Sequence, residues 1–94
     1  MSTFETNEFD NRSEPQQVVC TDTQLIVTLK DGREIATPLW WYPRLLNATP
    51  EQRTHYQLMR TGIHWPDVDE DLSIRGMLQG KKAPGATQPE PVGQ

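Results

Sequence analysis

The chain has 94 residues, with 13 acidic and nine basic side chains and a formal net charge of −4 at pH 7. A dominant nucleic-acid surface needs clustered Lys and Arg, so this balance argues against one. Cys20 is the only cysteine, which excludes an internal disulfide and favours a reduced, cytoplasmic setting. We expect a soluble protein, because no apolar run approaches ~20 residues and no signal peptide is evident.

Both ends of the chain are polar. Residues 1–14 have only Phe4 and Phe9 as large apolar side chains, and residues 80–94 are rich in Pro, Gly and Lys. Such segments cannot bury enough apolar surface to offset the entropy lost on ordering. We therefore predict disordered tails at 1–14 and 80–94 around one domain at 15–79. A domain of this size is marginally stable alone, so a homodimer or another partner would stabilise it.

Strands are predicted in the first half of the domain. Residues 17–20 form a short strand pattern, and residues 25–29 and 33–37 flank Lys30-Asp31-Gly32 as a hairpin. A two-residue turn would set Val27 opposite Ala36. A three-residue loop with a left-handed glycine would instead set Val27 opposite Ile35.

The second register is preferred because it follows the buried face. It gathers four apolar side chains on one side of the hairpin, with Thr28 and Glu34 on the other side. The four are Leu25, Val27, Leu29 and Ile35.

Two helices are predicted next. Pro43 is tolerated in a first helical turn, which indicates a short helix from Tyr42 to Asn47. Thr49-Pro50-Glu51-Gln52 matches a capping box, in which Thr49 caps the helix and Gln52 reaches back. A second helix therefore begins at Pro50.

The end of this second helix has two alternatives. The helix runs to Arg60 and Gly62 ends it, or it finishes near Thr54 and gives way to a strand at residues 56–59. That strand would pair with residues 63–65, and the alternation of Tyr56 and Leu58 favours it weakly.

The last predicted element is a short helix from Leu72 to Leu78, capped by Glu70 or Asp71 and ended by Gly80. Together the elements predict an α+β fold. A small antiparallel sheet, made of the hairpin and additional short strands, packs with two or three short helices.

Several of these segments resemble a family of small bacterial proteins, domain of unknown function 2442 (DUF2442). The likeness covers about two thirds of the chain, and the residues that carry it are Lys30-Asp31-Gly32-Arg33, Pro38–Leu45, Ala48–Arg53, Gly62–Pro66, Asp69–Ile74 and Leu78.

The resemblance implies a compact α+β domain with a small antiparallel sheet and no established activity. Some family members look as though they carry an added helix-turn-helix domain, and members tend to lie beside genes for toxin-like proteins, which implies an antitoxin-like or regulatory role. Only a polar tail follows Leu78 in this chain, which puts a direct repressor role in doubt.

The acidic run is the first candidate for chemistry. Asp67, Asp69 and Asp71 are spaced like the opening ligands of a calcium-binding loop. The match fails at Leu72, where the loop needs glycine, and at Leu78, where it needs a bidentate glutamate. We interpret the run as a solvated turn whose last carboxylates cap a helix, and we predict no metal or cofactor.

The histidines do not indicate an enzyme. His55, His64 and Cys20 cannot form a zinc site without carboxylates. A catalytic His64 needs a nucleophile, and neither Ser73 nor Cys20 lies in the glycine context of a nucleophile elbow. We expect His64 to be a sheet residue with a hydrogen-bonded or half-exposed ring.

The aromatic cluster of Trp40, Trp41, Tyr42 and Trp65 is first of all core material. Base-stacking surfaces interleave aromatics with basic residues, and only Arg44 is near in sequence. Adjacent tryptophans in a strand point to opposite faces, so one of Trp40 and Trp41 is expected at the surface, where it could anchor a protein partner.

The leading hypothesis is a non-catalytic protein-interaction module, an antitoxin-like or regulatory partner of a small basic protein. The candidate partner-binding residues are Trp40, Trp41, Tyr42, Arg44, His64, Trp65, Asp67, Asp69, Glu70 and Asp71. The alternative is a small dimeric nucleic-acid-binding transcriptional regulator, in which dimerisation gathers Arg33, Arg53 and Arg75 into one patch.

Overall fold

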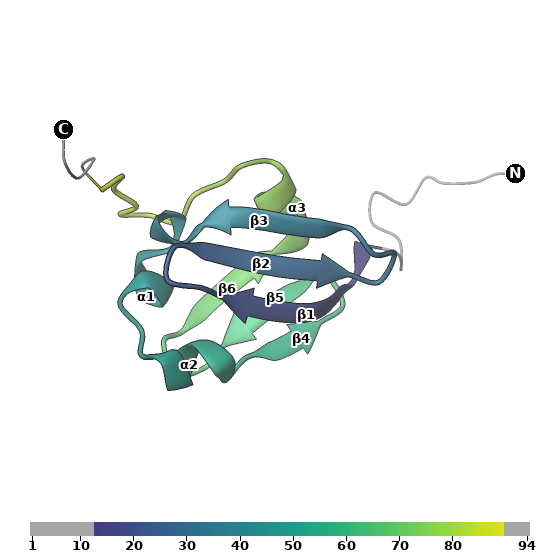
Figure 1. Ribbon diagram of the computed structural model, residues 1–94, viewed down its shortest axis with the longest axis horizontal. Helices are drawn as coiled ribbons and strands as arrows, with labels where there is room; N and C mark the ends of the chain where they lie inside the picture. The colour runs from purple at the N-terminus through teal and green to yellow at the C-terminus, as the bar shows by residue number, and fades with distance from the viewer. Residues whose placement is uncertain (1–12, 90–94) are drawn as a thin grey trace, which may run out of the picture.

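The computed structural model describes residues 13–89 and shows two small antiparallel sheets packed face to face, with short helices around them (Figure 1). Each sheet has three strands, and the predicted α+β class is confirmed. Most of the predicted N-terminal tail, residues 1–12, and the end of the C-terminal tail, residues 90–94, lie outside the described residues.

The first sheet has the order β1 (Pro15–Cys20), β2 (Gln24–Leu29) and β3 (Glu34–Pro38). The preferred hairpin register is confirmed, since Val27 pairs with Ile35. Gly32 closes the loop with a φ of +95°, a conformation that costs glycine little and other residues more. The inward side chains of β2 alternate with more exposed ones, as a half-buried sheet requires, and they are Leu25, Val27 and Leu29.

The second sheet has the order β4 (Gln57–Met59), β5 (Gly62–Trp65) and β6 (Glu70–Ser73). Of the two alternatives after α2 (Pro50–Thr54), the strand is therefore the one adopted. The predicted capping box at the start of α2 is also confirmed. Thr49 Oγ1 accepts from the Gln52 backbone N–H at 3.1 Å, and Gln52 Oε1 accepts from the Thr49 N–H at 2.9 Å.

The predicted helix from Leu72 with a Glu70 or Asp71 cap is wrong at its start. Residues 70–73 form β6, and α3 (Ile74–Leu78) follows it. Ser73 is the cap, because its hydroxyl accepts from the Gly76 backbone N–H at 2.9 Å. Strand pairing with β5 overrides the acidic capping pattern, since it directs Glu70 and Leu72 to the inner face of the sheet.

The core lies between the two sheets. Its largest fully buried side chains are Trp65 from β5 and Tyr42, which stands between the 3-10 helix η2 (Leu39–Trp41) and α1 (Pro43–Leu46). The two sheets, η2, α1 and α3 contribute the remaining members, which are Val18, Leu25, Val27, Leu29, Leu39, Leu45, Ile63, Ile74 and Met77.

The two margins of this sandwich differ. At one margin α3 contacts both β3 and β6. The chain after α3 continues there, and residues 81–83 of the predicted tail lie against the domain, since the Ala83 backbone N–H donates to the Trp41 carbonyl at 2.9 Å. At the other margin β1 and β4 lie side by side as edge strands (Figure 1). Among residues 13–89, no helix is long and apolar enough to span a membrane.

Candidate functional site

The structure places two of the candidate aromatic residues in the core. Trp65 is fully buried and its indole N–H donates to the Arg53 carbonyl at 3.1 Å. Tyr42 is also buried, and its hydroxyl donates to Thr37 Oγ1 at 2.9 Å. Burial raises the pKa of Tyr42, against the lowering effect of the Thr37 hydrogen bond. Neither ring is presented to a partner.

Trp40 and Trp41 are both half-buried, and they lie in η2 rather than in a strand. Their rings meet edge to face with centroids 6.5 Å apart. Trp41 is also covered by Lys82, whose ammonium lies 4.8 Å from the ring centroid. The 3-10 turn thus gives the pair a shared surface position that an extended strand would not.

The acidic run is divided among different environments. Asp67 pairs with His55, whose Nδ1 is 2.9 Å from Oδ2, and Asp71 pairs with the half-buried His64 at 2.7 Å. Asp69 has a φ of +56° in the turn, and its carbonyl accepts a hydrogen bond from the Arg44 guanidinium. The carboxylates therefore do not form one acidic face.

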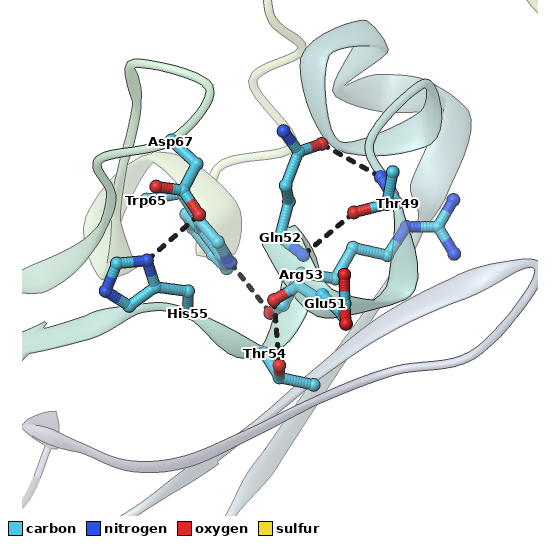
Figure 2. A network of polar contacts seen from close by, with 8 residues as sticks. All are labelled: Thr49, Glu51, Gln52, Arg53, Thr54, His55, Trp65 and Asp67. Atoms are coloured by element: carbon cyan, nitrogen blue, oxygen red, sulfur yellow. Dashed lines mark hydrogen bonds and ion pairs between the residues drawn. The ribbon is translucent and has the colours of Figure 1, made fainter.

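The pair of His55 and Asp67 belongs to a network that joins α2 to the turn after β5. Figure 2 shows this pair beside the indole of Trp65, which reaches the Arg53 carbonyl, and beside the capping box of α2. These contacts connect backbone and side chains of the two elements. Within residues 13–89, no three His, Cys, Asp or Glu side chains gather in a way that could hold a metal ion.

Glu70 is the one acidic residue of the run that is buried, with 7% of its surface exposed. Its Oε2 has no hydrogen-bond partner, and desolvation raises the pKa of its carboxyl, although the Asp71 backbone N–H and Arg44 lower it. Sequence reasoning placed Glu70 among the surface candidates. The signal that could have located it is the alternation through β6, which sets Glu70 on the same face as Leu72.

Exposed apolar side chains on two edge strands form a second feature, and none of them was among the candidate residues. The side chains of Val19, Leu58 and Met59 are exposed by 44%, 41% and 46% on the neighbouring edge strands β1 and β4, and we call these three residues with the two strand edges the open margin. Beside it lies a groove of about 320 Å³, between β1 and α2, whose lining includes Val18, Cys20, Pro50 and Tyr56.

The open margin has few of the features that protect edge strands. No Lys, Arg, Asp or Glu lies within β1 or β4, and among the described residues no strand pairs with their outer edges. Only the start of β1 has protection, from Pro15 and an irregular register before Gln17. Burial raises the pKa of the Cys20 thiol beside the groove, which keeps it protonated rather than nucleophilic.

The three arginines of the alternative hypothesis lie on separate elements. Arg33 follows the β2–β3 turn and binds Asp31 and Ser13. Arg53 in α2 donates to two backbone carbonyls, and Arg75 lies in α3.

Fold and surface together define a small two-sheet α+β domain. The family model described as "Protein of unknown function (DUF2442)" matches residues 15–83, and the chain therefore belongs to this family. No curated protein matches the chain.

Two solved structures share the fold. One is the solution structure of an uncharacterized protein from Chromobacterium violaceum, with 21% identity and a TM-score of 0.66, covering 77% of this chain and 70% of that one. The other is the crystal structure of a protein of unknown function from Rhodospirillum rubrum, with 25% identity and a TM-score of 0.64, covering 78% and 93%. Neither description gives an activity.

Proposed function

We propose that this protein is a non-catalytic protein-interaction module of the cytoplasm, an antitoxin-like or regulatory partner of a small basic protein, and that the partner binds at the open margin. The single observation that carries this proposal is the pair of adjacent, uncharged edge strands with exposed apolar side chains. An unpaired strand edge offers a row of backbone donors and acceptors that an extended segment of another chain can complete.

The chemistry of the margin favours an apolar, extended segment. Backbone pairing with β1 or β4 would supply affinity, and the groove between β1 and α2 would receive one side chain in every two. The outer row of the first sheet continues this apolar character, because Val19 pairs with Ile26 and Ile26 pairs with Ala36. Contacts across this row would extend the interface beyond the strand edge.

Charge favours a different protein over a second copy. The chain has a net charge of −4, which opposes self-association and attracts a basic partner. Trp40, Trp41 and Arg44 lie on η2 and α1 rather than on the edge strands, so they are outside the proposed interface.

The test is co-expression with the small proteins encoded beside its gene, followed by purification of any complex and titration of the separated components. We expect Leu58→Lys and Val19→Lys to weaken the complex at least tenfold. Leu78→Lys is the matched control, since Leu78 is an exposed leucine on α3, 54% exposed, away from the open margin. Equal affinity for the margin and control variants, or no complex with any neighbour, would contradict the proposal.

Sedimentation of the isolated chain tests whether a second copy of the chain, rather than a different protein, binds at the open margin. We expect a monomer at micromolar concentration. A dimer that Val19→Lys dissociates and Leu78→Lys leaves intact would assign the open margin to a second copy instead.

A further inference from the structure

Glu70 combines deep burial with an unpaired carboxylate oxygen. Glu70 is 7% exposed, and its Oε2 is a buried atom with no hydrogen-bond partner. Proteins rarely leave a buried polar atom unpaired, and such an atom often indicates a missing ligand, ion or water. The oxygen therefore requires a donor that the described residues do not supply.

Two hollows meet at this residue. One, of about 200 Å³, lies between β6, α3 and residues 81–84, and the other, of about 250 Å³, lies between α1 and the same C-terminal residues. Both are partly open to solvent. The first hollow, which we call the Glu70 hollow, has mainly apolar walls that include Tyr42, Leu72, Met77 and Ala83. A carboxylate at an apolar wall fits a ligand that has a cationic end and an aliphatic stem.

None of the neighbouring cations bonds Glu70 Oε2, although Lys81 and Lys82 also line the Glu70 hollow and Arg44 lowers the pKa of the carboxyl. The Arg44 guanidinium donates to the Asp69 carbonyl, and the Lys82 ammonium lies over the Trp41 ring. The carboxylate of Asp71, the next residue, pairs with His64. A cation that enters the Glu70 hollow therefore approaches a carboxyl whose Oε2 is hydrogen-bonded to no residue among 13–89.

We propose that the Glu70 hollow binds an aliphatic cation, a guanidinium or ammonium group on a short apolar stem, with the Glu70 carboxylate as its counter-ion. The site is separate from the open margin and does not depend on the proposed partner. Burial strengthens a charge pair that is desolvated on both sides and adds selectivity against neutral ligands of the same shape.

Binding should strengthen as the pH rises through the Glu70 pKa. Burial raises this pKa, so at lower pH the carboxyl is neutral and offers no charge to the ligand. The charged and titratable groups around it are Tyr42, Arg44, Asp69, Asp71, Lys81 and Lys82. Each must be considered when the pH profile is assigned, and the variant below separates Glu70 from the rest.

The test is an NMR titration of the whole chain with butylguanidinium chloride, and with N-butylurea as the neutral isostere. We expect saturable shifts of the Asp71, Gly76 and Ala83 amides with butylguanidinium only. Glu70→Gln should weaken binding at least tenfold, while Glu34→Gln, which removes an exposed carboxylate of β3, should leave it unchanged. Equal response to N-butylurea, no saturable shift, or undiminished binding by Glu70→Gln would overturn the proposal.

A measurement on the unaltered chain keeps the test independent of how the variants fold. The carboxyl carbon of Glu70 reports its own titration, and saturating butylguanidinium should lower the pKa of this group. An unchanged pKa would overturn the proposal. Free arginine and doubly blocked arginine then distinguish two sources of the cation, a free metabolite and a protein side chain. The free amino acid carries both charges at its α-carbon, whereas the blocked form resembles an arginine side chain within a protein.

Discussion

The two margins of the sandwich differ in whether the edges of their strands are covered. At the closed side, α3 and residues 81–83 cover the margin formed by β3 and β6, and Ile74 and Met77 are buried there. At the open margin, β1 and β4 leave their edges and three apolar side chains exposed. The comparison indicates that stability is concentrated on one side of the domain, while the other side retains surface that a partner can use.

The largest expected effect is a difference in stability between the sides. Ile74→Ala removes a fully buried side chain at the closed side and should lower the free energy of unfolding by about 2–5 kcal/mol. Leu58→Ala at the open margin should lower it by less than about 1 kcal/mol, because the side chain is 41% exposed. Denaturant unfolding measures both, and equal losses would break the comparison.

The cap of α3 gives the next effect. Ser73→Ala removes the hydroxyl that accepts from the Gly76 N–H and should cost about 1 kcal/mol. Ser73→Asp keeps a capping acceptor and should retain most of the stability. If both variants unfold alike, the cap does not hold the helix against the closed side. Thermal unfolding followed by circular dichroism distinguishes these outcomes.

The pH dependence of the free energy of unfolding tests the burial of the Glu70 carboxyl. Its folded-state pKa is raised above the usual value of 4.5, so the folded state binds the proton more tightly than the unfolded state. Stability from this group is therefore present below pH 4.5 and is lost as the pH rises through the folded-state pKa. Glu70→Gln should be more stable than the wild type at neutral pH and similar to it in acid. Unfolding at a series of pH values checks this, and a parallel pair of profiles would contradict it.

The smallest expected effect concerns the partly exposed pair of His64 and Asp71. Asp71→Asn should change the free energy of unfolding by less than about 1 kcal/mol, since the carboxylate side chain is 69% exposed. Asp67→Asn, at the pair with His55, is the matched comparison and should behave alike. A loss well above this limit at either position would show that the pair carries more of the structure than its exposure indicates.

Local patterns predicted part of this fold. Gly32 and the alternation of Val27 with its neighbours were enough to choose the hairpin register, and Thr49 and Gln52 were enough to locate α2. The start of α3 was not predictable from its acidic residues, because the pairing of β6 with β5 decides where Glu70 points.

The candidate site was harder to predict than the elements. Core packing was the first interpretation of Tyr42 and Trp65, yet both were also candidates for partner binding, and only long-range packing shows that they are buried. The open margin depends on which strand edges remain uncovered, and that follows from the strand order of the two sheets and from the contact between β1 and β4, which lie far apart in the chain. No local pattern carries this information.

The most direct test of the proposed role of the open margin is backbone amide hydrogen exchange on the purified complex and on the free chain. We expect the partner to slow exchange at residues 16–20 and 57–59, where strand edges become paired, and to leave residues 74–83 unchanged. Slower exchange at residues 74–83 with no change in β1 and β4 would contradict it.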